Sequence, residues 1–158
     1  MIAVADVRWL NEREERAWRA LQFMQMRLEA GLAGQLATEA GLSYPDYVVL
    51  VALTDQPGGR LRLFELGRKL GWEKSRLSHH VARMAGRELV EKQKCDSDRR
   101  GAYVAITPRG RREIEAAAPG HVRTVRQLFI DRLTPEEIDV VASIAERVLA
   151  ALDDQREG

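Results

Sequence analysis

The sequence predicts a mainly α-helical fold of the α+β class with one small β-hairpin, built as a single domain over residues 1–158. Apolar residues recur every three or four positions along most of the chain, as on the buried faces of amphipathic helices. Capping residues and helix breakers divide this pattern into six helical segments. After the fourth segment, two short β-like stretches flank a charged turn, which indicates a hairpin.

The first two helices begin at capping residues. Asn11–Glu14 has the pattern of a capping box, and the apolar stripe behind it continues to Leu36 before Gly41 ends the helix. Ser43–Asp46 has a similar pattern and predicts the start of the second helix. Residues 55–59 (Asp-Gln-Pro-Gly-Gly) have the composition of a turn.

Two short helices joined by a glycine-containing turn follow. The turn is Gly71-Trp72, and the apolar residues on either side of it are Leu63, Leu66 and Leu70, then Leu77, Val81 and Met84. This arrangement is the helix-turn-helix pattern. Residues 89–95 and 103–106 predict two strands joined by the charged turn 96–101. Residues 43–106 therefore predict a winged helix-turn-helix.

Two more helices are predicted after the hairpin. Thr107-Pro108 combines an N-cap residue with proline at the first helical position. Pro119-Gly120 falls inside this fifth helix, where a proline predicts a kink or a short break. Thr134–Glu137 is a capping box that opens the sixth helix.

The helices at the two chain ends predict dimerisation. The segments at about 11–36 and 134–153 carry long apolar stripes, lie outside the helix-turn-helix and are connected through 107–131. Such stripes need a partner surface, and DNA-binding proteins of this type usually bind as dimers. The alternative is that the two helices pack only on each other within one chain.

The charge distribution is uneven although the net charge is only +1. Residues 60–112 contain 15 Lys and Arg against 6 Asp and Glu, whereas the rest contains 10 against 18. A basic middle segment indicates a surface that faces a polyanion, or else an ordinary solvated face.

The fourth helix has the composition of a DNA-reading helix. At about 100° per residue its apolar residues share one side, and the rest of its surface is small, polar and basic. Ser and Arg side chains suit phosphates and guanine edges in the major groove. The residues expected to contact DNA here are Lys74, Ser75, Arg76, Ser78, His79 and Arg83.

The hairpin tip predicts a second contact. Arg99 and Arg100 are two adjacent cations that suit a narrow minor groove. Asp98 does not suit DNA and is expected to pair with a neighbouring arginine and stiffen the tip.

These features resemble the MarR family of transcription regulators over nearly the whole chain. The resemblance rests on Trp72–Val81, Arg87–Val90, Asp96–Gly101 and Ile106–Gly110, and Asp98-Arg99-Arg100 ahead of a Val-x-Ile-Thr-x-x-Gly run is its most specific part. It implies homodimers held by the terminal helices, near-palindromic operators, and often a small-molecule or oxidant signal that weakens DNA binding.

On this basis we expect a ligand-responsive repressor that binds double-stranded DNA as a homodimer. By the same resemblance, the recognition-helix residues are Ser75, Arg76, Ser78, His79 and Arg83, and the wing residues are Arg99 and Arg100. Two alternatives stay open: a winged-helix protein-interaction module without DNA binding, and a DNA-binding regulator without an effector.

One position departs from the family pattern. Glu88 stands where the family commonly has glycine in the turn into the wing. If this position requires a positive φ, a glutamate there costs roughly 1 kcal/mol or more. The alternative is that Gly86 absorbs the bend.

Other functions have little support. We find no catalytic constellation, so an enzyme and a cofactor are not expected. The adjacent His79 and His80 point about 100° apart on a helix, which is poor geometry for a metal site with His121 or Cys95. Cys95 is expected to be a packing residue, with an oxidation sensor as the alternative. Without a signal peptide or membrane span, we expect a cytoplasmic protein.

Overall fold

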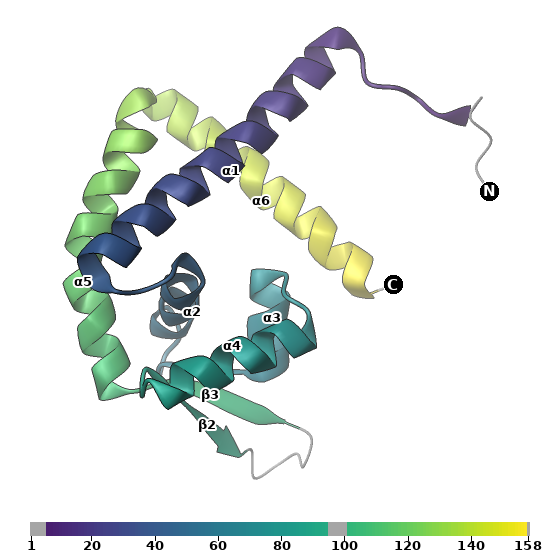
Figure 1. Cartoon of the computed structure of the whole chain (residues 1–158). Coiled ribbons are helices and arrows are strands. Elements are labelled where there is room, and N and C mark those ends of the chain that lie inside the picture. Colours follow the sequence, from purple (N-terminus) through teal and green to yellow (C-terminus); the bar gives the residue numbers. More distant parts are fainter. Residues whose placement is uncertain (1–5, 95–100, 158) are drawn as a thin grey trace.

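The computed structural model describes residues 6–94 and 101–157. Within these residues the chain forms six α-helices, a short 3₁₀ helix and a three-stranded sheet (Figure 1). The helices are α1 (Glu12–Ala40), α2 (Tyr44–Thr54), α3 (Leu63–Leu70), α4 (Lys74–Gly86), α5 (Pro108–Leu128), η2 (Ile130–Arg132) and α6 (Pro135–Glu157). The strands are β1 (Arg60–Arg62), β2 (Val90–Lys94) and β3 (Ala102–Ile106). The predicted fold class is confirmed.

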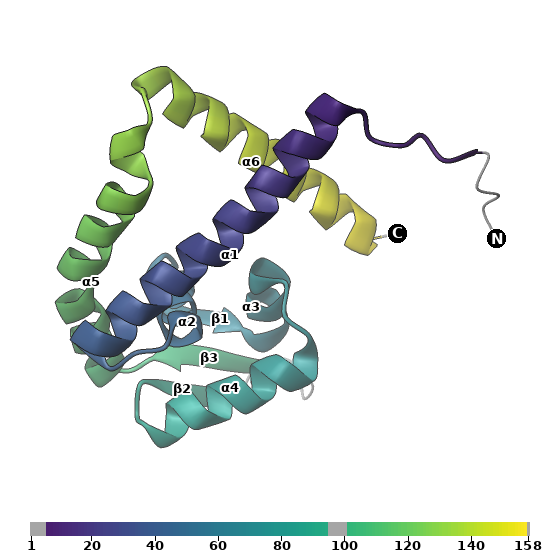
Figure 2. The ribbon, with the colours of Figure 1, turned by 45° about the horizontal axis from the view of Figure 1, so that its top comes forward.

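The elements form two regions (Figures 1 and 2). α2, α3, α4 and the sheet lie together, and α1 and α5 pack against each other beside them. α6 turns back from the far end of α5 and extends over the side of the molecule that carries α3 (Figure 2). This arrangement leaves α4 on the side of the molecule away from α6.

The core lies around α2. The side chains of α2 pack against α1, α3, α5 and the sheet, and burial of each large aliphatic side chain contributes roughly 1.5–3 kcal/mol. The largest fully buried side chains are Leu36, Leu42, Val49, Leu50, Leu53, Leu66, Leu77, Val81, Met84, Val90 and Val104.

The predicted capping boxes are present. The Asn11 side chain accepts from the Glu14 backbone N–H, and Ser43 does the same with Asp46. At the start of α6, the Glu137 backbone N–H donates to the Thr134 hydroxyl at 3.2 Å. In each case the acidic side chain accepts from the backbone N–H of the capping residue. These local contacts explain why the helix starts could be predicted.

β1 was not predicted from the sequence. It is a three-residue strand that pairs antiparallel with β3, with Arg60 opposite Ala105, so the sheet order is β1-β3-β2. Gly58 and Gly59 precede it with φ of 86° and 66°, a conformation that glycine adopts without steric cost. The strand is too short for a periodic pattern, and its partner lies about 40 residues away.

The fifth helix contains a proline in its interior. We expected a kink or a short break at Pro119, and the structure excludes the break because α5 continues through this residue. Pro119 and Glu115, one turn earlier, are both exposed. Water can therefore hydrate the Glu115 carbonyl that proline leaves without a donor.

The turn into the wing settles the question raised by Glu88. Glu88 has φ of 60°, whereas Gly86 is the last residue of α4, so the alternative that Gly86 absorbs the bend is wrong. The Leu89 N–H donates to the Met84 carbonyl at 3.0 Å, and the Glu88 N–H donates to Ala85 at 2.9 Å. These two bonds form a Schellman motif, in which the residue now occupied by Glu88 is usually glycine.

Candidate nucleic-acid interface

α4 has one buried side and one exposed side. Leu77, Val81 and Met84 lie in the core, as the helical spacing predicted. The opposite side carries the residues expected to contact DNA. Of these, Lys74, Ser75, Arg76, His79 and Arg83 are exposed and Ser78 is half-buried. Since α4 itself contains no acidic residue, this surface presents only neutral and cationic side chains.

The beginning of α4 also favours an anion. Glu73 is the N-cap residue, but its side chain makes no capping hydrogen bond. The first backbone N–H groups of α4 are therefore not capped by this side chain, and they lie at the positive end of the helix dipole. A phosphate near Lys74 and Ser75 would find both a cation and backbone donors.

Cation–π contacts hold three arginines in place. The Arg76 guanidinium lies 4.4 Å from the centre of the Trp72 ring. On the sheet, the guanidinium groups of Arg60 and Arg62 lie 4.4 and 5.5 Å from the centre of the Tyr103 ring. Such contacts restrict a long side chain and lower the entropy that it loses on binding. Arg60 and Arg62 were not among the predicted contacts, although both fall in the basic segment.

A polar cluster connects the exposed side of α4 to the start of α2. It consists of Asp46, His80, Arg83 and Arg87, and we call it the Asp46 cluster. Arg87 donates to Asp46 Oδ2 at 2.7 Å and to the Gly41 carbonyl at 3.0 Å. His80 Nε2 lies 3.0 Å from Asp46 Oδ1, but without hydrogen-bond geometry, so this contact is electrostatic. The cluster joins α4 to the α1–α2 junction.

Burial and partners set the charge states in the cluster. Burial alone would raise the pKa of Asp46, but hydrogen bonds from Ser43 and Arg87 outweigh it and leave the pKa below its usual value. Burial is the main cause that lowers the pKa of His80, and the nearby Arg83 and Arg76 charges act in the same direction. Asp46 is thus ionised and His80 neutral at pH 7. The sequence showed Asp46 only as a capping residue.

Some predicted site residues lie outside the described part of the chain. Arg99, Arg100 and Asp98 fall between residues 94 and 101, as does Cys95. Their roles stay predictions. Across 6–94 and 101–157 no group of three His, Cys, Asp or Glu side chains is arranged to hold a metal ion. Of the helices described, none is long and apolar enough to span a bilayer.

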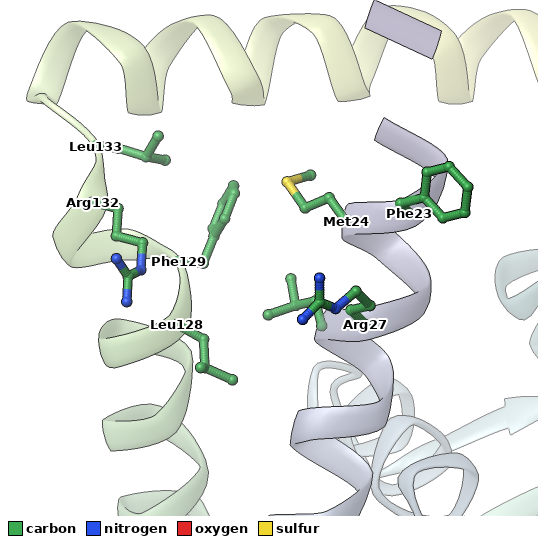
Figure 3. Close-up of a pocket in the computed structure, with 8 residues that line it drawn as sticks. Phe23, Met24, Arg27, Leu128, Phe129, Arg132 and Leu133 are labelled. Carbon is green, nitrogen blue, oxygen red and sulfur yellow. The ribbon is translucent and has the colours of Figure 1, made fainter. Parts of the chain in front are cut away.

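A second surface is apolar. α1 and α6 expose large hydrophobic residues, among them Phe23, which is 63% exposed. In α1 they include Trp18, Leu21, Phe23, Met24 and Met26, and in α6 Val140, Val141, Ile144, Val148, Leu149 and Leu152. Met24 also lines a hollow of about 540 Å³, in which Met24 and Arg27 of α1 face Leu128 and Phe129 (Figure 3).

Comparisons with known proteins agree with this geometry. A MarR family model matches residues 40–101, which contain α2, α3, α4 and most of the sheet. The transcriptional regulator HosA of Escherichia coli O111:H- is 30% identical over 112 residues, which is 70% of this chain and 79% of HosA.

Two solved structures are similar over most of the chain. Sco3205, a MarR family transcriptional regulator from Streptomyces coelicolor crystallised in complex with DNA, has a TM-score of 0.86 and 38% identity, covering 91% of this chain and 94% of Sco3205. AbsC, another MarR family regulator from Streptomyces coelicolor, has a TM-score of 0.85 and 36% identity, covering 92% and 98%. With its winged helix-turn-helix and these relatives, the chain belongs to the MarR family.

Proposed function

We propose that this chain is a transcription regulator that binds double-stranded DNA through the exposed side of α4. The observation that carries the proposal is the acid-free, partly basic surface of α4, with its buried side fixed in the core. The Sco3205 complex with DNA supports it, because that protein shares the fold and 38% of the sequence. We expect Arg76, near the start of α4, to bind a phosphate, and Arg83 to read a base or bind a phosphate.

We further propose that the regulator is a homodimer that binds a near-palindromic operator. In α6 every residue from 135 to 156 is exposed except the half-buried Ile138, so its apolar side chains are left without cover in a single chain. A second copy that packs on α1 and α6 would bury them and would fill the hollow in Figure 3. Two α4 helices related by a two-fold axis would then read half-sites about 34–36 Å apart.

A small ligand is proposed to control DNA binding, and the protein is proposed to act as a repressor. A hollow of about 320 Å³ between α2, the end of α3 and α5 has the size for a small molecule. In it the rings of Tyr47 and His121 lie 4.2 Å apart, and Lys69 supplies a cation. His121 Nδ1 is buried and has no hydrogen-bond partner in the described part of the chain, so a ligand donor would satisfy it. The alternative is a regulator controlled only by its own concentration.

Selection from a random duplex pool tests the proposed function. We expect an enriched, near-palindromic site that binds two chains. Relative to wild type, Arg76→Ala/Arg83→Ala should bind this site at least tenfold more weakly, since each charge-assisted contact contributes about 1–3 kcal/mol. The matched control is Arg123→Ala, which removes an exposed arginine from α5 and should leave binding unchanged.

Two outcomes would contradict the proposal. Binding that survives loss of both α4 arginines would show that another surface contacts DNA. Failure of the folded wild type to bind any duplex would favour the protein-interaction module.

A further inference from the structure

The Arg83 side chain contacts His80, a residue that has no part in the proposed DNA contact. Its Cα lies on the exposed side of α4, but its Nη2 lies 3.1 Å from Nδ1 of His80, one helical turn earlier. The His80 side chain is buried, with the residue only 8% exposed. A surface arginine is thereby anchored to a buried ring.

The hydrogen-bonding groups of arginine determine which nitrogen of the His80 ring carries the proton. Arginine has only N–H donors, so Nδ1 of His80 must be the acceptor and carry no proton. In the neutral ring the proton then lies on Nε2, which faces Asp46 Oδ1 at 3.0 Å. The negative charge of Asp46 favours a proton at this position. Asp46 is in turn fixed by Arg87 at 2.7 Å.

The surroundings of the ring come from three parts of the chain. The charged groups that face it are Asp46 of α2, Arg83 and Arg76 of α4, and Arg87, which reaches it through Asp46. The Trp72 ring, in the turn before α4, meets it edge-on at 5.4 Å. The ring therefore has one carboxylate on its Nε2 side and a guanidinium on its Nδ1 side.

We propose that His80 is a positioning residue that holds the Arg83 guanidinium for DNA contact, and that a proton on Nδ1 releases it. Protonation converts the acceptor for Arg83 into a donor and places two cations against each other. Arg83 must then leave its position on the α4 surface. This inference rests on the proposed contact between Arg83 and DNA.

The first test compares three variants on the selected duplex at pH 7.5. His80→Phe keeps a buried ring but lacks the acceptor, and we expect it to weaken binding about threefold to tenfold. His80→Asn places an oxygen near Nδ1 and should restore most of the affinity. Arg83→Met should weaken binding at least as much as His80→Phe, and the double variant should be no weaker than Arg83→Met because both changes remove one contact. Thermal unfolding checks that each variant is folded.

The second test uses pH. Wild type and His80→Asn share all other titrating groups, so the ratio of their affinities isolates the ring. Because burial lowers the pKa of His80 from its usual value of 6.5, the ring becomes mostly protonated only at a pH below that value. Over the pH range in which NMR shows the ring taking up its second proton, we expect the affinity of wild type to fall relative to that of His80→Asn. A constant or rising ratio would overturn the inference.

NMR of the ring nitrogens needs no variant. We expect Nε2 to carry the proton and Nδ1 to be bare at pH 7.5, and a proton on Nδ1 at that pH would overturn the inference. The two proposals fail differently. If Arg83→Met binds as wild type, the DNA contact of Arg83 is wrong. If Arg83→Met is weak but His80→Phe is not, only the positioning role is wrong.

Discussion

The residue with the most constrained backbone is Glu88. Among the described residues it is the one non-glycine residue with positive φ, and it occupies the glycine position of the Schellman motif that ends α4. Its carboxylate pairs with Arg109 at 3.1 Å, but both side chains are well exposed, so this pair contributes little. Its carbonyl accepts from the Thr107 hydroxyl at 2.5 Å, which ties the turn to the start of α5. The conformation is therefore imposed by its neighbours.

Replacing this residue with glycine should stabilise the protein. Glu88→Gly removes the steric cost of the left-handed conformation, and we expect the free energy of unfolding to rise by about 1 kcal/mol. Urea unfolding measures it. Glu88→Ala keeps the Cβ and loses only the Arg109 pair, so it should be neutral or slightly destabilising. Equal stability of the Gly and Ala variants would show that the turn carries no strain.

At the scale of elements, the wing is attached to the rest of the fold at the first turn of α5. The Thr107 N–H donates to the Leu89 carbonyl at 3.1 Å, and Gly110 packs against the same carbonyl. A Cβ at Gly110 would overlap the Leu89 oxygen, which is backbone and cannot move aside cheaply. A side chain at this position must therefore separate α5 from the strand that leads into the wing.

Two glycine-to-alanine variants test this close approach. Gly110→Ala should lower the free energy of unfolding by about 2 kcal/mol or more because of overpacking. Gly34→Ala is the matched control, because nothing lies within 4 Å of an added Cβ there. It should raise stability by about 0.5–1 kcal/mol through helix propensity. Thermal and urea unfolding measure the change in stability of both variants. A Gly110→Ala variant as stable as wild type would contradict the close packing of Gly110 on the Leu89 carbonyl.

The elements that could be predicted are those with local signals. Capping boxes and apolar spacing lie within a few residues, so the helix starts and the buried side of α4 follow from the sequence. β1 and the Asp46 cluster depend on partners far along the chain. Arg87 reaches Asp46 over 41 positions, and no local pattern marks that contact. The sequence alone marks His80 only as a candidate metal ligand, because its burial and its contact with Asp46 depend on tertiary packing.

At the scale of the whole molecule, the basic segment and the exposed apolar residues lie in different regions of the fold. The basic segment folds into the helix-turn-helix and sheet, and the exposed apolar side chains gather on α1 and α6. α6 is joined to the first region by Arg156, which donates to the Arg68 carbonyl at the end of α3 at 3.0 Å. In the proposed dimer, this contact links the subunit interface to the helix that precedes the recognition helix.

The salt dependence of duplex binding tests the central claim most directly, because its slope counts the phosphates that the protein neutralises and a variant in α4 shows how many of them α4 contacts. A plot of log K against log salt for wild type should be steep and linear. For Arg76→Ala the slope should become shallower by about two per dimer, one for each lost phosphate contact, with Arg123→Ala parallel to wild type. A flat wild-type plot, or an Arg76→Ala slope equal to that of wild type, would contradict the account.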